Sequence, residues 1–290
     1  MKPGTHLKSM FSPNYGAESM GVAPVLSIII PVYNERAHLA EFVDFIYRSD
    51  CPIDREFIFI DDLSSDGSRE MLRELQLVRN FTLIEQETHQ GKGAAVRRGI
   101  QIAHGDYILI QDADFELDPN DVPLLLEPLL EGRADCVYGS RFKKTNQQVH
   151  RTLRYFVNRS LTFVSNLFSG IYLTDVAVCY KITKADLLKS MNLRTSRFGF
   201  DVEFTAYIAK TAARIFELPI RYYPRTKYEG KKIGWTDGMA AFCHILRFNF
   251  LVPLDKAFNN LPSKYLRSPL RNPSNASHNA ETSEPKHKTA

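Results

Sequence analysis

Two aspartates separated by one residue, Asp112 and Asp114, follow a short apolar run in the first half of the 290-residue chain. Alternate side chains of an extended backbone share a face, so both carboxylates are expected to point into one crevice, and Glu116 continues the series. Carboxylate oxygens suit Mg²⁺ or Mn²⁺, and such an ion would neutralise a diphosphate. A D-x-D pattern occurs about once by chance at this composition, so its position after a strand gives it weight. The alternative is a solvated acidic turn.

Polar residues also follow two other apolar runs. Residues 31–35 (PVYNE) come after the first run, and residues 61–67 (DDLSSDG) come after the second. Open parallel sheets bind ligands at the carboxyl ends of their strands, so these clusters are expected to meet at one edge. Helix capping by Asp and Ser would explain one such cluster, but it explains three together less well.

The glycine-rich segment 90–94 (QGKGA) carries a third signal. It lacks the G-x-x-x-x-G-K-[ST] pattern of a P-loop, and it does not follow the first strand as G-x-G-x-x-G does, which disfavours both nucleotide-binding classes. Lys92 and nearby backbone N–H groups would face an anion at the start of a helix. A simple loop with helix-starting glycines is the equally weighted alternative.

The second half supplies cations and aromatic residues. Residues 139–142 (GSRF) end the fifth apolar run, a helical stretch follows at 151–168, and residues 222–234 are dense in Tyr, Lys and Arg. Such a loop would clamp a phosphorylated substrate, or it would be an ordinary solvated basic loop.

These residues must be positioned by alternating strands and helices. Apolar runs at 25–31, 56–61, 81–85, 107–111 and 136–139 predict strands, and amphipathic stretches at 37–47, 69–78, 93–103 and 123–130 predict helices. This alternation indicates an α/β fold with a parallel sheet covered on both faces.

Composition limits the organisation and the class of partner. With 44% hydrophobic residues the chain can bury one core, which we place at 24–255, between a flexible N-terminus (1–23) and a disordered tail (268–290).

A net charge of +4 is too small for a nucleic-acid binder but suits phosphates or an anionic membrane. Four scattered cysteines suggest no zinc or disulfide framework, and no signal peptide or membrane span is apparent. We expect a cytoplasmic protein.

Taken in order, these motifs resemble family 2 glycosyltransferases of the GT-A fold, particularly dolichyl-phosphate mannose synthases and bacterial polyprenyl-phosphate glycosyltransferases. The resemblance runs over about 25–250, with markers at 30–35, 60–62, 65–67, 91–93, 111–114, 139–141 and 225–231. It implies a Rossmann-like, mostly parallel sheet flanked by helices, with a C-terminal acceptor-side extension. The nucleotide-sugar half would then be 24–140 and the acceptor half 141–255.

The resemblance also implies roles for individual residues. The nucleotide sugar would be bound by Pro31, Tyr33, Glu35, Asp61, Lys92, Asp112, Ala113 and Asp114, and the metal by Asp114 and Glu116. Arg141 and Arg154 would bind the acceptor phosphate, while Arg225 and Lys231 would close over the diphosphate. Catalysis would then rest on Asp112, Asp114, Arg225 and Lys231. Residues 175–181 (DVAVCYK) depart from the family, which usually has a small polar residue and Gly before the aromatic.

The chemistry of the acceptor separates two hypotheses. A lipid phosphate is already ionised near neutrality and needs cationic positioning, whereas a sugar hydroxyl needs a general base. We therefore predict inverting transfer of a hexose, from a GDP-mannose or UDP-glucose type of sugar donor, to polyprenyl or dolichyl phosphate. The alternative is a glycan hydroxyl acceptor with Asp201 or Glu203 as base. A non-catalytic nucleotide-sugar binding module is a third possibility.

Access to a lipid acceptor would come from the membrane surface. Segments 151–168 and 238–254 both mix Phe, Leu and Ile with Arg or His, as interfacial helices do, although core packing explains the same residues about as well. Many members of the family carry C-terminal membrane helices that this sequence lacks. We therefore expect peripheral binding or a membrane-anchoring partner.

Overall fold

The computed structural model describes residues 23–143, 152–197, 199–224 and 235–267. The segments expected to be flexible or disordered at the two ends lie outside these ranges, apart from residue 23. Arg225 and Lys231 also lie outside them.

One seven-stranded sheet forms the centre, in the order β3-β2-β1-β4-β6-β5-β7. Neighbouring strands are parallel except that β6 runs antiparallel to both β4 and β5. The predicted mostly parallel sheet is confirmed, and each strand predicted from the sequence is found within two residues at either end. The strands are β1 (Val25–Val32), β2 (Asp54–Asp61), β3 (Thr82–Glu85), β4 (Tyr107–Ile110), β5 (Cys136–Ser140), β6 (Lys181–Lys184) and β7 (Ile215–Pro219).

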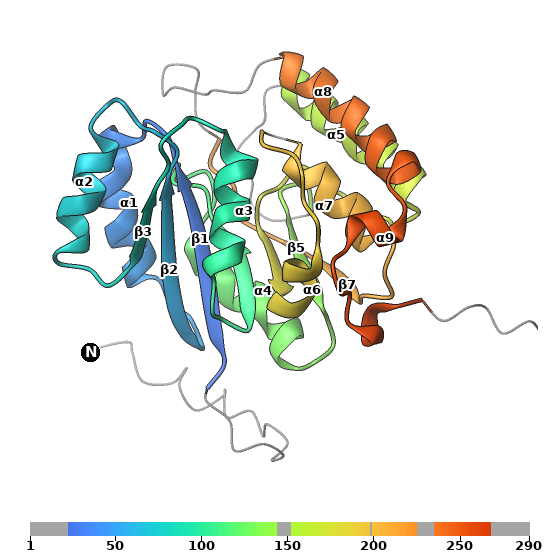
Figure 1. Ribbon diagram of the computed structural model, residues 1–290, viewed down its shortest axis with the longest axis horizontal. Coiled ribbons are helices and arrows are strands. Elements are labelled where there is room, and N and C mark those ends of the chain that lie inside the picture. The colour runs from blue at the N-terminus through green and yellow to red at the C-terminus, as the bar shows by residue number, and fades with distance from the viewer. Residues whose placement is uncertain (1–22, 144–151, 198, 225–234, 268–290) are drawn as a thin grey trace, which may run out of the picture.

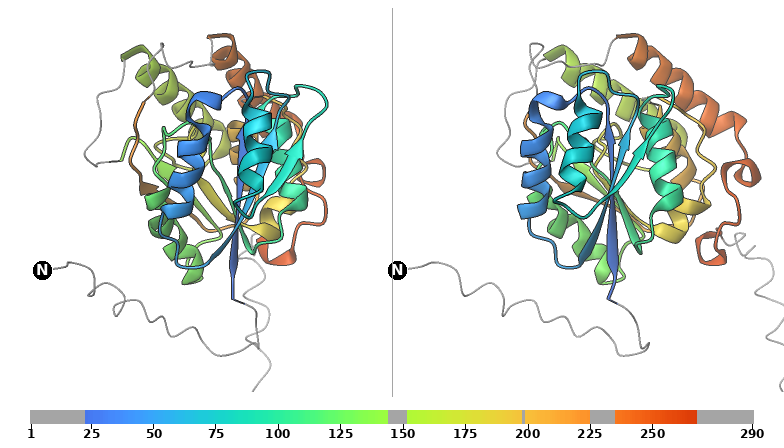
Figure 2. Two further views of the ribbon diagram at one scale, coloured as in Figure 1. Left: turned by 90° about the vertical axis from the view of Figure 1, so that its left-hand side faces the viewer. Right: turned by 60° about the vertical axis from the view of Figure 1, so that its left-hand side comes forward.

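Helices cover both faces of this sheet, as Figures 1 and 2 show: α1 (Arg36–Arg48) and α4 (Val122–Leu130) lie on one face, and α3 (Lys92–Ile102) and α6 (Ala185–Ser190) on the other. Helix α2 (Ser68–Gln76) packs beside α1. Helical spacing explains the burial, because α1 turns Leu39, Phe42, Val43 and Ile46 inward. Gly99 lets α3 approach the sheet closely, since a Cβ there would overlap Ile29.

Three further helices, α5 (Thr152–Ser169), α7 (Phe200–Ile208) and α8 (Trp235–Leu246), pack together beyond the sheet (Figure 1). A five-residue π-helical segment, η3 (Arg247–Leu251), extends α8, and α9 (Leu254–Ala257) follows. These helices share a small core of their own, separate from the main one, formed by Leu161, Val176, Val202, Ala241 and Ile245. Within the described ranges, no helix is both long enough and apolar enough to cross a bilayer.

The two halves expected from the sequence share the sheet. Strands β6 and β7 come from the second half, yet β6 lies between β4 and β5 of the first. Strand β6 of the second half is therefore hydrogen-bonded directly to β4, the strand that Asp112 and Asp114 follow.

Candidate functional site

The carboxyl ends of β1, β2 and β4 meet at one edge, because β1 pairs with both of the others. The loops that follow β1 and β2 are tied together there. The side-chain oxygen of Asn34 accepts a hydrogen bond from the Ser65 amide at 2.8 Å, and the Glu35 amide donates to the Ser68 hydroxyl at 2.9 Å. These hydrogen bonds hold the segment that contains Pro31, Tyr33 and Glu35 at the edge of the sheet, where all three residues are partly exposed.

The two adjacent aspartates that follow β2 have different partners. Asp61 is fully buried, and its carboxylate accepts hydrogen bonds from Arg69 Nε at 2.6 Å and from the Ser64 amide at 3.2 Å. These contacts tie Asp61 to α2 and to the loop after β2, and its role in nucleotide binding stays a prediction.

Asp62, which the sequence did not single out, organises the loop before α3. Its carboxylate accepts hydrogen bonds from the amides of Gln90 at 2.8 Å and Gly91 at 2.7 Å, and it lies 2.9 Å from His89 Nδ1. The anion at the start of α3 is thus a side chain of the protein itself. The His89 ring stacks on Tyr33, with ring centroids 4.1 Å apart.

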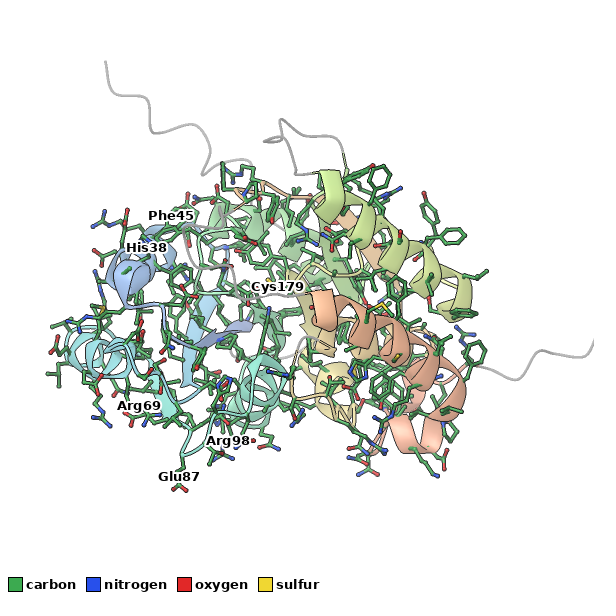
Figure 3. All side chains as sticks on the ribbon, turned by 90° about the horizontal axis from the view of Figure 1, so that it is seen from above. His38, Phe45, Arg69, Glu87, Arg98 and Cys179 are labelled. Carbon is green, nitrogen blue, oxygen red and sulfur yellow. The ribbon has the colours of Figure 1, made fainter. Side chains whose placement is uncertain are left out.

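Lys92 and Asp112 form an ion pair across the edge, with Lys92 Nζ 2.6 Å from Asp112 Oδ1. Burial alone would raise the pKa of Asp112, but the Lys92 ammonium, with smaller contributions from Cys179 and Lys181, outweighs burial and holds that pKa below the usual range. The Cys179 thiol lies close enough to Asp112 to help lower the pKa of that carboxyl, and burial raises the pKa of Cys179, so the thiol keeps its proton. Figure 3 shows Cys179 near the centre of the molecule, between the two groups of helices. Lys92 therefore pairs with Asp112 in this structure, and its binding of the nucleotide sugar stays a prediction.

The turn after β4 has an unusual backbone. Phe115 adopts a φ of 56°, a left-handed conformation that is strained for a bulky residue. Its ring packs edge-on against Phe42 at 5.6 Å and stacks against Phe45 at 5.8 Å, both on α1. This turn holds Asp114, whose Oδ1 accepts from the Glu116 amide at 3.1 Å, next to Glu116. Ala113 is buried within the same turn.

An open groove of about 820 Å³ lies on the outer side of this turn. It is lined by α1 together with Phe115, Leu117 and Tyr223. Neither Asp112 nor Lys92 is among its lining residues, so the groove is distinct from the charged cluster.

The chemistry of Asp114 and Glu116 fits a divalent cation shared with a substrate. Mg²⁺ usually takes one or two carboxylates from a protein and completes its shell with water and substrate phosphates. Asp114 and Glu116 supply two carboxylates from one turn. The described part of the chain contains no group of three or more His, Cys, Asp or Glu side chains that would hold a metal alone. These residues therefore suit a metal that arrives with a phosphorylated ligand.

Tyr222 links this acidic turn to Arg141, which follows β5. Its hydroxyl donates to Glu116 Oε2 at 3.2 Å, and its ring lies 5.2 Å from the guanidinium carbon of Arg141. Arg141 is held by two hydrogen bonds to the buried Asp175, at 2.7 and 2.8 Å. The guanidinium of Arg141 is thus fixed against the ring whose hydroxyl contacts Glu116. Arg154 lies in α5, but its side chain is outside the described part.

The two carboxylates weighed as a general base are both engaged. Asp201 lies 2.5 Å from Nζ of the buried Lys181. Glu203 is fully buried and accepts hydrogen bonds from the amides of Arg194 and Thr195, both at 2.8 Å. In this arrangement Asp201 neutralises a buried cation, and Glu203 anchors the loop before α7.

Comparisons with known proteins agree with this geometry. Residues 27–191 match the family model described as Glycosyl transferase family 2. An undecaprenyl-phosphate 4-deoxy-4-formamido-L-arabinose transferase from Aeromonas hydrophila is 26% identical over 211 residues, 71% of this chain and 62% of the relative. A dolichol-phosphate mannosyltransferase from Pyrococcus furiosus is 26% identical over 214 residues, 73% of this chain and 60% of the relative. The matched region thus spans about three fifths of each relative's length.

A solved structure supports the fold. Glucosyl-3-phosphoglycerate synthase from Mycobacterium tuberculosis, in complex with Mn²⁺, uridine diphosphate and glucosyl-3-phosphoglycerate, superposes with a TM-score of 0.60. The superposition covers 78% of this chain and 80% of the synthase, at 19% identity. At this identity the likeness concerns the fold alone.

Proposed function

Because the chain belongs to glycosyl transferase family 2, we propose that it transfers a hexose from a nucleotide sugar to a polyprenyl or dolichyl phosphate, with inversion at the sugar carbon. The sugar donor is of the GDP-mannose or UDP-glucose type. Both curated relatives described above are named for sugar transfer to a polyprenyl phosphate, which supports this class of acceptor.

The observation that carries the proposal is the position of Tyr222. This residue contacts Glu116 through its hydroxyl and Arg141 through its ring, so an acidic turn and a fixed guanidinium lie on either side of one tyrosine. A reaction between a diphosphate sugar and a phosphate needs both: carboxylates for a cation on the diphosphate, and an Arg for the incoming phosphate.

The proposed mechanism needs no general base, since a phosphate acceptor is already an anion near neutrality. Arg141 orients the acceptor phosphate for in-line attack, and Asp112, held by Lys92, orients the sugar donor. Asp114 and Glu116 would hold Mg²⁺ or Mn²⁺, which stabilises negative charge on the departing nucleoside diphosphate. We assign Arg225 and Lys231 to the same diphosphate. Asp201 and Glu203 are left out as bases because their carboxylates are engaged.

We place the acceptor at the cytoplasmic face of a membrane, reached through an apolar surface on α5, α8 and η3. Helix α5 exposes Phe156, Phe163 and Leu167 at seven- and four-residue spacing, with Phe163 68% exposed. Phe250 of η3 is 63% exposed, and its ring centroid lies 5.1 Å from that of Phe168 on α5. This contact makes the apolar side chains of η3 continuous with those of α5. Exposed aromatic and aliphatic side chains of this kind favour an interfacial position. A membrane-anchoring partner would strengthen the binding.

Membrane binding is tested by flotation of the full chain with vesicles that contain anionic lipid at low salt. The double variant Phe163→Glu, Leu167→Glu should lose at least half of the vesicle-bound fraction, because two exposed apolar side chains that would insert into the lipid surface become negatively charged. Leu77→Glu is the matched control, since Leu77 is 87% exposed and lies at the end of α2. Equal binding by the double variant and the wild type would remove this surface from the proposal.

Turnover is tested with labelled nucleotide sugars and a short-chain polyprenyl phosphate, in the presence of Mg²⁺ or Mn²⁺. Asp114→Asn should lower kcat/KM by about a hundredfold or more, since it removes one metal-binding charge. Asp54→Asn is the matched control, because Asp54 is exposed at the opposite end of β2. Full activity of Asp114→Asn would contradict the assignment. Absence of turnover with every lipid phosphate, alongside transfer to a glycan hydroxyl, would contradict the acceptor.

A further inference from the structure

Glu203 is a fully buried carboxylate that the proposed mechanism does not use. It lies in the first turn of α7 and faces the loop that precedes this helix. One oxygen accepts a hydrogen bond from the Arg194 amide at 2.8 Å, and the other accepts from the Thr195 amide at 2.8 Å and the Thr195 hydroxyl at 2.6 Å. Three donors from two successive residues offset the cost of burying this charge, and they fix the course of the loop backbone.

The same loop, residues 194–197, lies directly against the start of α3. The Ser196 carbonyl accepts a hydrogen bond from the Ala94 amide at 3.2 Å, and the side chain of Arg97 donates to the Thr195 carbonyl. The first bond is made to the first turn of α3 and the second to its next turn. The 194–197 loop therefore fixes both the position and the direction in which this helix begins.

Two glycines make this close contact possible. A Cβ at the buried Gly93 would lie 2.4 Å from the Thr195 carbonyl oxygen and 2.9 Å from that of Arg197. A Cβ at Gly91 would lie 2.6 Å from the Ser196 carbonyl oxygen. Each of these distances is well inside van der Waals contact, so a side chain at either position would push the loop and the helix apart. Both glycines thus serve the packing of the 194–197 loop.

Lys92 lies between these two glycines. Its Nζ lies 2.6 Å from Oδ1 of Asp112, which orients the sugar donor in the proposed mechanism. A shift of the start of α3 would move Lys92, and with it the carboxylate that Lys92 holds. Contacts therefore run from Glu203 through the 194–197 loop to Lys92 and end at Asp112.

We propose that Glu203 is a positioning residue for the sugar donor, because it holds the 194–197 loop against the start of α3 and so fixes Lys92 and Asp112. This inference rests on the proposed function and deepens it, since a carboxylate weighed as a general base receives a different role. A general base would take a proton from an acceptor hydroxyl. Glu203 instead acts through backbone contacts, on the side of the site that meets the nucleotide sugar.

The test measures steady-state kinetics with a labelled nucleotide sugar, a short-chain polyprenyl phosphate and Mn²⁺. Glu203→Gln turns one accepting oxygen into a donor, so it should raise KM for the sugar donor about tenfold and leave KM for the acceptor and the shape of the pH profile unchanged. Loss of folded protein would lower kcat alone, so KM separates position from stability. Glu74→Gln is the matched control, since Glu74 is exposed on α2.

A milder variant keeps the test open if Glu203→Gln folds poorly. Thr195→Val removes only the hydroxyl that donates to Glu203 and leaves both amide hydrogen bonds in place. It should raise KM for the sugar donor about threefold, again without a change in KM for the acceptor.

Gly93→Ala disturbs the same contact from the side of α3 and should also raise KM for the sugar donor about tenfold. If both residues act through the 194–197 loop, the double variant Glu203→Gln, Gly93→Ala should stay well below the product of the two effects, about a hundredfold. Gly238→Ala is the matched control, because a Cβ there would meet only Val157, at 3.9 Å.

The outcomes separate this inference from the proposed function. If the wild type transfers sugar and neither Glu203→Gln nor Thr195→Val changes KM for the sugar donor, the positioning role is overturned while the proposed function stands. Independent effects in the double variant would overturn it as well. A fall in kcat with loss of one limb of the pH profile would identify a general base instead. If the wild type transfers sugar to no lipid phosphate, the positioning role and the proposed function fail together.

Discussion

At the scale of single residues, Cys179 is the clearest departure from the family pattern. Its thiol lies beside Asp112 and helps lower the pKa of that carboxyl, which also forms an ion pair with Lys92. Because burial keeps the thiol protonated, Cys179 can donate to the carboxylate across the neutral pH range. We expect this bond to help fix the orientation in which Asp112 meets the sugar donor.

Cys179→Ala should therefore lower kcat/KM for the sugar donor about fivefold, the effect of one hydrogen bond worth roughly 1 kcal/mol. Cys179→Ser restores a donor and should recover most of the loss. Steady-state kinetics alongside a melting curve separate this effect from lost packing, and the exposed Cys243→Ala serves as control. Unchanged kinetics in Cys179→Ala would show that Lys92 alone positions Asp112.

Sequence spacing revealed the acidic residues but not their partners. The D-x-D pattern and Glu116 stand out because they follow a strand, whereas Asp62, His89 and Tyr222 gain their importance from contacts between distant segments. Tyr222 meets Glu116 across 106 positions of the chain. The sequence singled out Asp61 but not Asp62, because the contacts of Asp62 with Gln90 and Gly91 join segments that lie far apart in the chain.

At the scale of elements, the turn that follows β4 is held by an aromatic anchor. The strained φ of Phe115 persists because its ring packs between Phe42 and Phe45 of α1. The same turn carries Asp114 and Glu116. Packing on one side of the turn therefore determines where the carboxylates lie on the other.

Phe115→Ala should destabilise the protein by about 2 kcal/mol and raise the Mn²⁺ concentration needed for half-maximal activity, because it removes the anchor and keeps the strain. Phe115→Gly should be more stable than Phe115→Ala by about 1 kcal/mol, since glycine accepts a positive φ. Chemical unfolding and metal titration measure both effects, with Leu77→Ala, at an exposed position away from the membrane-binding surface, as control. If Mn²⁺ activation is the same in all variants, Phe115 contributes packing only.

The elements of the first half were predictable, and those of the second half were less so. Strands buried on both faces, such as β1 and β2, are continuous apolar runs that the sequence displays directly. Strand β6 has the sequence KITK, in which Lys181 is buried only because Asp201 neutralises it. A short strand with two lysines gives no such signal, so neither β6 nor its antiparallel direction was expected.

At the scale of the whole molecule, Asp135 joins three strands at the end of the sheet opposite the site. It precedes β5, and its carboxylate accepts hydrogen bonds from the Arg214 amide and guanidinium, before β7, and from Lys184 at the end of β6. Burial alone would raise the pKa of Asp135, but these hydrogen bonds and the charge of Lys184 outweigh it and hold that pKa well below its usual range.

A carboxyl with a lowered pKa in the folded state stabilises the protein above its unfolded pKa of about 3.9, and that contribution is lost as the pH falls toward the folded pKa. Asp135→Asn should therefore cost about 2 kcal/mol at pH 7, and the difference from the wild type should shrink below about pH 4. Urea unfolding at several pH values measures this. A constant difference from pH 7 to pH 3 would contradict the assignment.

The insertion of β6 between β4 and β5 has a consequence for recombining this protein with its relatives. A chain cut at residue 140 would leave β4 with an exposed edge and β5 without either of its neighbours, because β6 and β7 both come later. Exposed strand edges favour aggregation. Chimeras that exchange the sugar-donor half for that of another glycosyltransferase must therefore carry β6 from the parent that supplies β4 and β5. In this fold β4, β5 and β6 must therefore be exchanged as one unit, whichever substrates the loops of the chimera bind.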